Sequence, residues 1–175
     1  MEKRSLISTR YTVSKKDKRL LIRKVRDCLG GSATEILKQS RKVEKVKTRI
    51  DNVIVIMVDS KPLFILMGEE VYPTIVGHVK FGIMVDIPIV YVDSGAVPHI
   101  LNGADVMAPG IVRITGEMSK GDIVYIGEDE NKRIFGAGKA LMEKDEIFSL
   151  KRGKAIKNVH YAGDKVWDLI IRELL

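Results

Sequence analysis

The stretch VDSGAVPHILNGADVMAPGI, residues 92–111, decides how the second half of the chain folds. It continues an apolar run, Ile89–Val92, whose β-branched composition is typical of a strand. Its Asp-Ser-Gly triplet can cap a short helix over Ala96–Leu101, and Asn102-Gly103 is typical of a helix end. A loop that finishes in Pro-Gly then leads into Ile111–Thr115, a second β-rich run. The stretch therefore predicts a strand, a short helix, a tight loop and a strand.

Short β-rich runs continue beyond this stretch, at Ile123–Ile126, Ile134–Ala140 and Ala155–Val159. Several short strands separated by glycine and turn residues are typical of a small barrel. Gly136-Ala137-Gly138 lies between β-type residues and opens no helix, so it predicts a strand bend or a close backbone approach rather than a phosphate loop. Asp164–Leu174 has the apolar spacing of a helix and is expected to close the second domain.

The first half begins with a possible strand, Lys3–Thr9, followed by a helix that Ser14 can cap. Gly30-Gly31 is expected to end that helix. Its inward stripe consists of Leu21, Ile22, Val25, Cys28 and Leu29, and its opposite, basic face consists of Lys15, Lys16, Arg19, Arg23 and Arg26. The helix is therefore expected to pack on a sheet of its own domain and to leave a basic face in water.

From Glu35 to Met67 the apolar period changes to two, which indicates strands. Asn52–Val58 and Leu63–Met67 form a hairpin pattern, and Pro62 is expected to lie outside its ladder. Tyr72-Pro73 indicates the entry to a short helix. That helix is expected to turn Ile75, Val76 and Val79 inward. The chain is thus α+β, with an N-terminal domain over residues 1–87 and a C-terminal barrel domain over residues 88–175.

The charge of the chain is unevenly distributed. Lys and Arg number 30 against 23 Asp and Glu, a net charge of +7. Residues 1–50 hold 16 basic and 5 acidic residues, whereas residues 91–175 hold 12 and 13. This asymmetry favours a polyanion such as nucleic acid as partner, although a solvated basic face would have the same composition.

No motif of a catalytic or metal site stands out. The three histidines, His78, His99 and His160, have no cysteine or carboxylate at metal-ligand spacing, and Cys28 is the single cysteine. Serine-nucleophile and phosphate-loop motifs are absent from the sequence. The longest apolar runs are too short to span a bilayer. We therefore expect a cytoplasmic binding protein with no metal, no cofactor, no membrane contact and no enzyme activity.

The stretch at residues 92–111 resembles the opening of a PUA domain, the module named for pseudouridine synthase and archaeosine transglycosylase. Gly121-Asp122-Ile123-Val124 resembles the Gly-Asp-x-Val strand entry of that family, and Phe135–Ala140 resembles its Gly-x-Gly strand. The resemblance covers roughly residues 89–160 and implies a β-pseudobarrel that binds RNA. In this family the first helix and the loop after it face the RNA.

Further segments resemble a narrower family. Asp59–Phe64, Tyr72-Pro73-Thr74 and Asn158-Val159-His160-Tyr161, with Asp164 and Trp167, are similar to the archaeal and eukaryotic family related to malignant-T-cell-amplified-sequence protein and to the start of ligatin. Its members carry a pre-PUA domain before the PUA domain. This resemblance implies action on tRNA or the small ribosomal subunit in translation initiation or recycling, with a translation factor as possible partner protein.

The expected RNA-binding residues fall into three groups. In the PUA domain they are Ala96, His99, Asn102, Gly103, Ala104 and Gly110, with Lys139, Arg152 and Lys154 for phosphates; in the first domain they are the five residues of the basic helix face. Three alternatives remain open at this stage: a targeting subunit for an RNA-modifying enzyme, such an enzyme itself, and a protein–protein adaptor with a basic face. The near-neutral second half indicates that RNA affinity depends on the first domain or on a partner.

Overall fold

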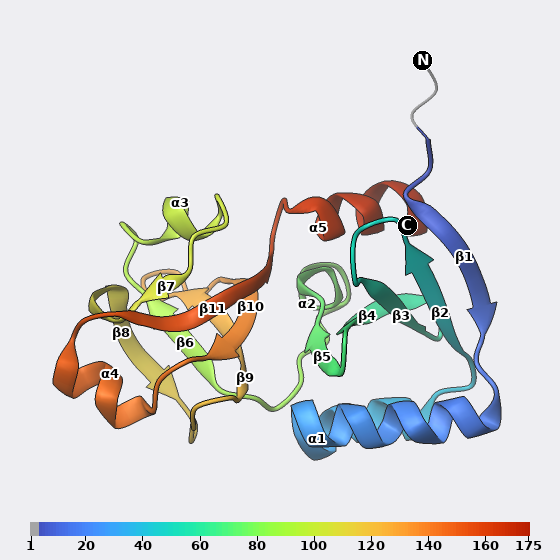
Figure 1. Cartoon of the computed structure of the whole chain (residues 1–175), viewed down its shortest axis with the longest axis horizontal. Coiled ribbons are helices and arrows are strands. Elements are labelled where there is room, and N and C mark those ends of the chain that lie inside the picture. The colour runs from blue at the N-terminus through green and yellow to red at the C-terminus, as the bar shows by residue number, and fades with distance from the viewer. Residues whose placement is uncertain (1–3) are drawn as a thin grey trace. The chain divides into compact units, whose positions relative to one another are not determined.

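The computed structural model describes residues 4–175 and divides the chain into two compact units (Figure 1). The first unit contains the chain up to Asp86 together with Lys165–Leu175, and the second contains Ile87–Asp164. Each unit has its own sheet, so the fold is α+β, as predicted. Part of the expected first strand, Lys3, lies outside the described residues.

The sheet of the first unit is antiparallel, with the strand order β1-β2-β3-β4-β5. Its strands are β1 (Ile7–Thr12), β2 (Val43–Thr48), β3 (Ile54–Val58), β4 (Lys61–Met67) and β5 (Glu70–Pro73). The predicted hairpin is β3–β4, and its turn residues Asp59 and Ser60 have φ values of 47° and 65°. The expected place of Pro62 outside the ladder is wrong, because Pro62 lies inside β4 opposite Met57. The strand register shifts at this position, and such an irregularity accommodates a residue that has no backbone N–H.

Helix α1 (Lys15–Gln39) starts as predicted, because the Ser14 hydroxyl accepts a hydrogen bond of 3.0 Å from the Asp17 amide. The predicted end at Gly30-Gly31 is confirmed, because Gly30 has a φ of 78° and a ψ of -162°, outside the helical region, and two helical segments meet there. The second segment continues to Gln39, so the strand pattern expected from Glu35 is wrong there. Leu21, Val25 and Leu29 are buried before Gly30, and Ala33 and Leu37 are buried after it, so each segment has an inward face of its own. The Thr34 hydroxyl donates to the Gly30 carbonyl at 2.8 Å.

Helix α2 (Ile75–Phe81) is capped by Thr74, whose hydroxyl accepts from the Gly77 amide at 2.9 Å. Pro73 ends β5 and does not enter the helix, which corrects the prediction. Val79 also differs from the prediction, since 53% of its surface is exposed. A helix of seven residues makes only about two turns and buries one side, and its buried residues are Ile75, Val76 and Gly77.

The terminal helix belongs to the first unit and not to the second, which corrects the expected domain 88–175. Helix α5 (Lys165–Leu169) continues into a short π-helical segment, η2 (Ile170–Leu174). Val166, Leu169 and Ile170 pack in one cluster with Val46, Val55 and Ile65, which project from one face of the first sheet. That face would be left in water without α5, and burying its apolar area is what fixes the helix there.

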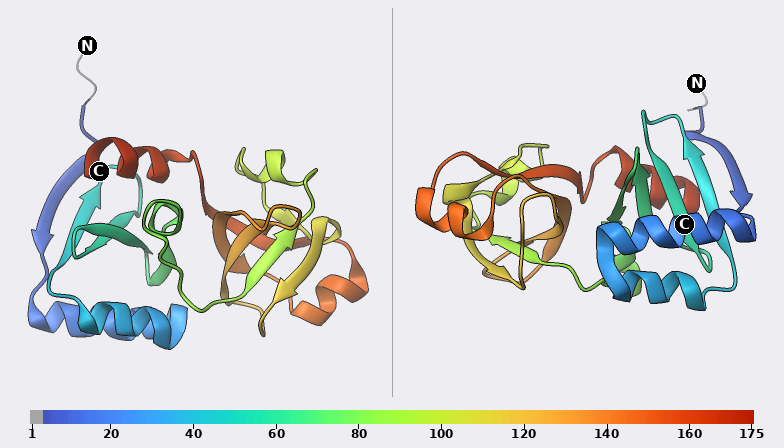
Figure 2. Two further views of the ribbon diagram at one scale, coloured as in Figure 1. Left: turned by 180° about the vertical axis from the view of Figure 1, so that it is seen from behind. Right: turned by 60° about the horizontal axis from the view of Figure 1, so that its bottom comes forward.

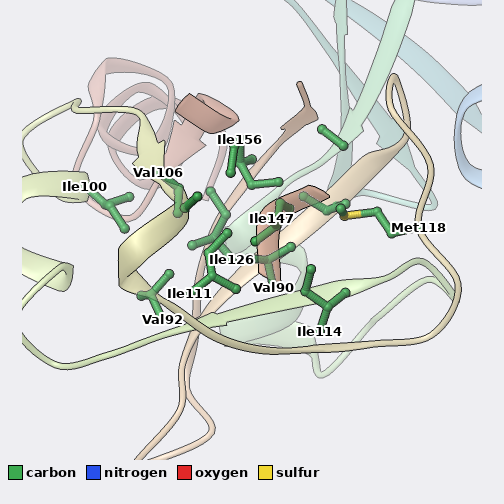
Figure 3. Close-up of a cluster of buried hydrophobic side chains, with 14 of the residues drawn as sticks. Val90, Val92, Ile100, Val106, Ile111, Ile114, Met118, Ile126, Ile147 and Ile156 are labelled. Carbon is green, nitrogen blue, oxygen red and sulfur yellow. The ribbon is translucent and has the colours of Figure 1, made fainter. Parts of the chain in front are cut away.

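The second unit contains a six-stranded sheet with the order β7-β11-β10-β9-β6-β8. Its strands are β6 (Ile89–Val92), β7 (Val106–Met107), β8 (Ile111–Thr115), β9 (Ile123–Glu128), β10 (Ile134–Ala140) and β11 (Lys154–Tyr161). The sheet encloses one apolar core, in which Val90, Ile126 and Ile156 gather (Figure 3). A Cβ at Gly138 would overlap the Lys157 carbonyl, so the predicted close backbone approach is confirmed.

Three short elements complete the second unit: α3 (Val97–Ile100), the 3₁₀ turn η1 (Ala108–Gly110) and α4 (Lys144–Leu150). Sequence patterns did not predict α4. Its cap is Glu143 rather than a hydroxyl residue, and the Glu146 side chain accepts from the Glu143 amide at 3.0 Å. The two-residue strand β7 was also not predicted, because a strand of that length has no period.

Candidate nucleic-acid interface

Helix α3 and the loop after it form one wall of a groove in the second unit. The Asp93 carboxylate accepts from the Ala96 amide at 2.9 Å and starts the turn, as predicted. Gly103, with a φ of 94°, ends it. The groove has a volume of about 460 Å³ and is lined by Asp93, Ala96, His99, Ile100, Ala104, Asp105, Val106, Met107, Pro109 and Gly110.

Most of the expected loop residues meet at this groove. Ala96, His99, Ala104 and Gly110 line it. A Cβ at Gly110 would lie 3.3 Å from the Ala96 Cβ, so the small residues allow the two walls to approach closely. Asn102 and Gly103 lie in the connecting loop and are exposed. The groove is therefore narrow, largely apolar and edged by exposed peptide groups.

Asn158 of β11 holds this loop in place. Its amide Nδ2 donates to the carbonyls of Ile100 and Ala104 at 2.9 and 3.0 Å, and its backbone N–H donates to Asp105 Oδ1 at 2.9 Å. Three hydrogen bonds from one residue thus fix both ends of the Leu101–Ala104 segment. Sequence patterns assign Asn158 no role in the site, although an asparagine inside a β-rich run is unusual and signals a special contact.

The end of β11 supports the same loop. A Cβ at Gly103 would lie 3.2 Å from the Tyr161 hydroxyl oxygen, so the ring of Tyr161 lies against the loop. His160 is fully buried, and its Nδ1 lies 2.8 Å from Asp164 Oδ2, which also accepts from the Tyr161 amide at 3.0 Å. These contacts explain why Asn158–Tyr161 and Asp164 occur together in the sequence.

A basic turn lies at the edge of the groove. The Ala108 amide donates to the Gly153 carbonyl at 2.9 Å, and Lys154 pairs with Met107 between β11 and β7. The Lys154 ammonium lies 3.4 Å from Asp105 Oδ2, and Arg152 is exposed. Lys139 is not brought to the groove. It lies on β10, opposite Lys157, one strand further from β7.

The basic face of α1 lies in the first unit. All five of its residues are exposed, whereas Leu21, Val25 and Leu29 are buried and Ile22 and Cys28 are half-buried. Arg26 lies 3.9 Å from Asp27, and within residues 4–175 the other four cations form no ion pair with a carboxylate. The predicted amphipathic arrangement of this helix is confirmed.

Other classes of site find little support in the described part of the chain. Residues 4–175 contain no group of three or more His, Cys, Asp or Glu side chains that could hold a metal ion. Within the same range, no helix combines the length and the apolar character needed to cross a membrane.

Comparison with known proteins gives the class first: residues 88–162 match the PUA domain family. The chain is 37% identical over 162 residues to an uncharacterised protein of Methanocaldococcus jannaschii, covering 93% of this chain and 97% of the relative. It is 28% identical over 143 residues to translation machinery-associated protein 20 of Saccharomyces cerevisiae, covering 78% and 77%.

A hypothetical protein of Pyrococcus horikoshii has the same fold along most of its length. It superposes with a TM-score of 0.78 at 34% identity and covers 92% of this chain and 99% of its own. The chain therefore belongs to the family of PUA-domain proteins that includes translation machinery-associated protein 20 and the malignant T-cell-amplified sequence proteins. The family predicted from the sequence motifs is confirmed.

Proposed function

We propose that this protein binds RNA through the groove beside α3 and acts on tRNA or the small ribosomal subunit in translation initiation or recycling. The observation that carries the proposal is the groove itself, about 460 Å³ in volume, with Ala96, Ala104 and Gly110 in its lining and the basic turn of residues 152–154 beside its strand β7. Its setting in a PUA domain supports RNA as the ligand, and the name of the yeast relative supports translation as the process.

Each part of the groove has a matching part in a nucleotide. Glycine and alanine keep side chains away from the peptide groups, so a sugar–phosphate backbone can approach them. The apolar walls, which include Ile100 and Val106, can receive a base. His99 can stack or donate, and Asn102 can bond a base edge or a 2′-hydroxyl. Arg152 and Lys154 can neutralise phosphates.

The basic face of α1 would act as a less selective anchor in this scheme. Its five exposed cations are five of the 16 basic residues within residues 1–50. Contacts of this kind raise affinity for any RNA and depend strongly on salt. We further propose that the protein acts in the cytoplasm, with a translation factor as partner, and without a cofactor or catalytic activity of its own.

A pair of substitutions at Gly103 tests the groove. Gly103→Asp and Gly103→Asn place the same Cβ against Tyr161 and the same strain on a φ of 94°. The two variants differ only in charge. A carboxylate about 4 Å from a phosphate costs about 1 kcal/mol in water, so the Asp variant should bind tRNA about fivefold more weakly than the Asn variant. If both variants bind tRNA as tightly as the wild type, the proposal that RNA binds at this groove is wrong.

Sedimentation with purified small ribosomal subunits separates translation from RNA modification. Co-sedimentation that is lost in Gly103→Asp and kept in Gly103→Asn is the result expected. Retention of an RNA-modifying enzyme in a nuclease-treated pull-down, without subunit binding, would favour a targeting subunit. Retention of an acidic protein under the same conditions would favour an adaptor.

A further inference from the structure

One face of the first sheet carries an exposed aromatic side chain between cations. β1 is an edge strand, as two further views also show (Figure 2), and the Tyr11 side chain on it is 41% exposed. Tyr11 pairs directly with Lys45 on β2, and Thr9 pairs with Lys47. Directly paired residues share a face, so both lysines flank the ring. The Lys47 ammonium lies 5.7 Å from the centre of the Tyr11 ring. We name Tyr11, Lys45 and Lys47 the β1–β2 platform.

The positive charge of the platform is not compensated. Within residues 4–175, neither Lys45 nor Lys47 forms an ion pair with a carboxylate. The acidic residue on these two strands, Glu44, projects from the opposite face and is only 8% exposed. Arg10 and Lys42 already neutralise it, at 3.0 and 3.1 Å, and the Arg10 hydrogen bond lowers the pKa of the Glu44 carboxyl.

A hollow opens beside the platform. It has a volume of about 250 Å³, and Lys47, Asn52, Ile54 and Leu66 are among the residues that line it. Ile54 pairs with Lys47 on one side and with Leu66 on the other, so the hollow continues the platform face across β3 and β4. Helix α5 covers the opposite face, where Val46 and Val55 are buried. On the face that carries Tyr11, Ile56 and Phe64 are fully buried, so this face is open only at its edge, around Tyr11, Lys47 and the hollow.

We infer that the β1–β2 platform and its hollow form a binding site for an unpaired RNA segment. One base stacks on the exposed part of the Tyr11 ring, the lysines neutralise the adjoining phosphates, and the hollow receives a neighbouring base. Aromatic side chains on a sheet face, with lysines beside them, bind single-stranded RNA in this way. A paired base offers no free face, so a duplex gains only the charge contacts. The inference rests on the proposed RNA-binding function and adds a second contact region, in the first unit.

The chemistry of the platform favours RNA over an acidic peptide. A peptide carboxylate would use the two lysines and leave the ring and the apolar floor of Ile54 and Leu66 unused. A nucleotide uses all three features at once, because its flat base and its phosphate are covalently joined. β1 also leads directly through Ser14 into α1, where the exposed basic face begins at Lys15. The surrounding charge therefore favours a polyanion.

The test measures the binding of the full chain to two fluorescein-labelled RNAs, a short oligouridylate and a duplex of equal length. Tyr11→Leu should lower the affinity for oligouridylate about 5-fold to 150-fold, the range found when one stacking aromatic is removed. Tyr11→Phe should keep the wild-type affinity. Lys45→Gln and Lys47→Gln should each make the slope of log affinity against log salt concentration about 0.7 less steep for the single strand. Lys80→Gln, an exposed lysine on α2, is the matched control and should change the salt slope less.

The melting temperature of each variant shows whether the fold is retained. Tyr11→Phe should melt close to the wild type, and Tyr11→Leu should stay folded but melt slightly lower, because Tyr11 is only 41% exposed and leucine replaces only part of the buried ring. If Tyr11→Leu binds oligouridylate as tightly as the wild type while Gly103→Asp weakens RNA binding, the inference that the platform binds RNA is wrong. The proposed function would then still stand. Equal losses for duplex and single strand would refute stacking. If no variant changes RNA binding but Tyr11→Leu loses an acidic protein, the platform is a protein surface and the inference is wrong.

Discussion

Replacing Asn158 by Asp should release the loop of the candidate groove. The substitution keeps the shape of the side chain but turns its Nδ2 donor into an oxygen that faces the carbonyls of Ile100 and Ala104. Two hydrogen bonds of 2.9 and 3.0 Å are lost. At about 0.5–1.5 kcal/mol each, the loop should lose about 1–3 kcal/mol of local stability, before any repulsion between the oxygens.

Hydrogen exchange measures this loss directly. The amides of Asn102, Gly103 and Ala104 donate to carbonyls within the same turn, at 3.0 to 3.1 Å. A loss of about 1–3 kcal/mol should speed their exchange about 5-fold to 150-fold if they exchange through local opening. Amides of β9 and β10 do not contact the loop carbonyls, so their exchange rates should stay closer to the wild-type rates.

The matched control is Asn131→Asp, which adds the same charge in an exposed turn of the same unit, where Asn131 Nδ2 donates to Glu128 Oε2 at 3.1 Å. It should leave the exchange of the loop amides unchanged. Wild-type exchange at Asn102–Ala104 in Asn158→Asp would refute the reasoning, because the loop would then be held without Asn158. Faster exchange throughout the second unit would also refute it, since Asn158 would then support the whole domain.

Two further predictions concern the charges of the first unit. Replacing both Arg19 and Arg23 by Gln should lower the affinity for many RNAs alike, and the slope of log affinity against log salt concentration should become about one to two units less steep. The melting temperature should change little. An unchanged affinity and slope would contradict the proposal that the basic face of α1 anchors RNA. The pKa of the Glu44 carboxyl is lowered by the Arg10 hydrogen bond, so its contribution to stability is present above the unfolded pKa and is lost as the pH falls through the folded pKa. Urea unfolding of Glu44→Gln should accordingly show lower stability than the wild type at neutral pH, with the difference shrinking in acid.

Local sequence patterns predicted the elements that local hydrogen bonds and backbone geometry fix. Ser14 caps α1, the Asp93 carboxylate starts the turn of α3, and Gly103 ends that turn with positive φ. Each of these contacts joins residues that are close in the chain, so the residue types alone indicate it. The motif at residues 92–111 also identified the family, because it specifies a strand, helix and loop that must follow one another directly.

Tertiary packing decided the rest. Gly30 ends the first segment of α1, as its residue type indicates, but a second helical segment follows and buries Ala33 and Leu37, so the region from Glu35 is a helix and not the expected strand. The terminal helix has an apolar face that either domain could bury, and only the open face of the first sheet determines which one does. Propensity carries no information on such a choice, because burial depends on what lies opposite.

The candidate sites show the same division. The sequence determined the loop residues of the groove and the basic face of α1, since both lie within one short segment. Asn158 and Tyr161 reach that loop from β11, and Lys45 and Lys47 reach Tyr11 from β2. Those partners are brought together by strand register alone, and register is set by long-range pairing and burial. The sequence by itself thus determined which segments are suited to bind RNA, whereas the tertiary structure decided which distant side chains hold and complete them.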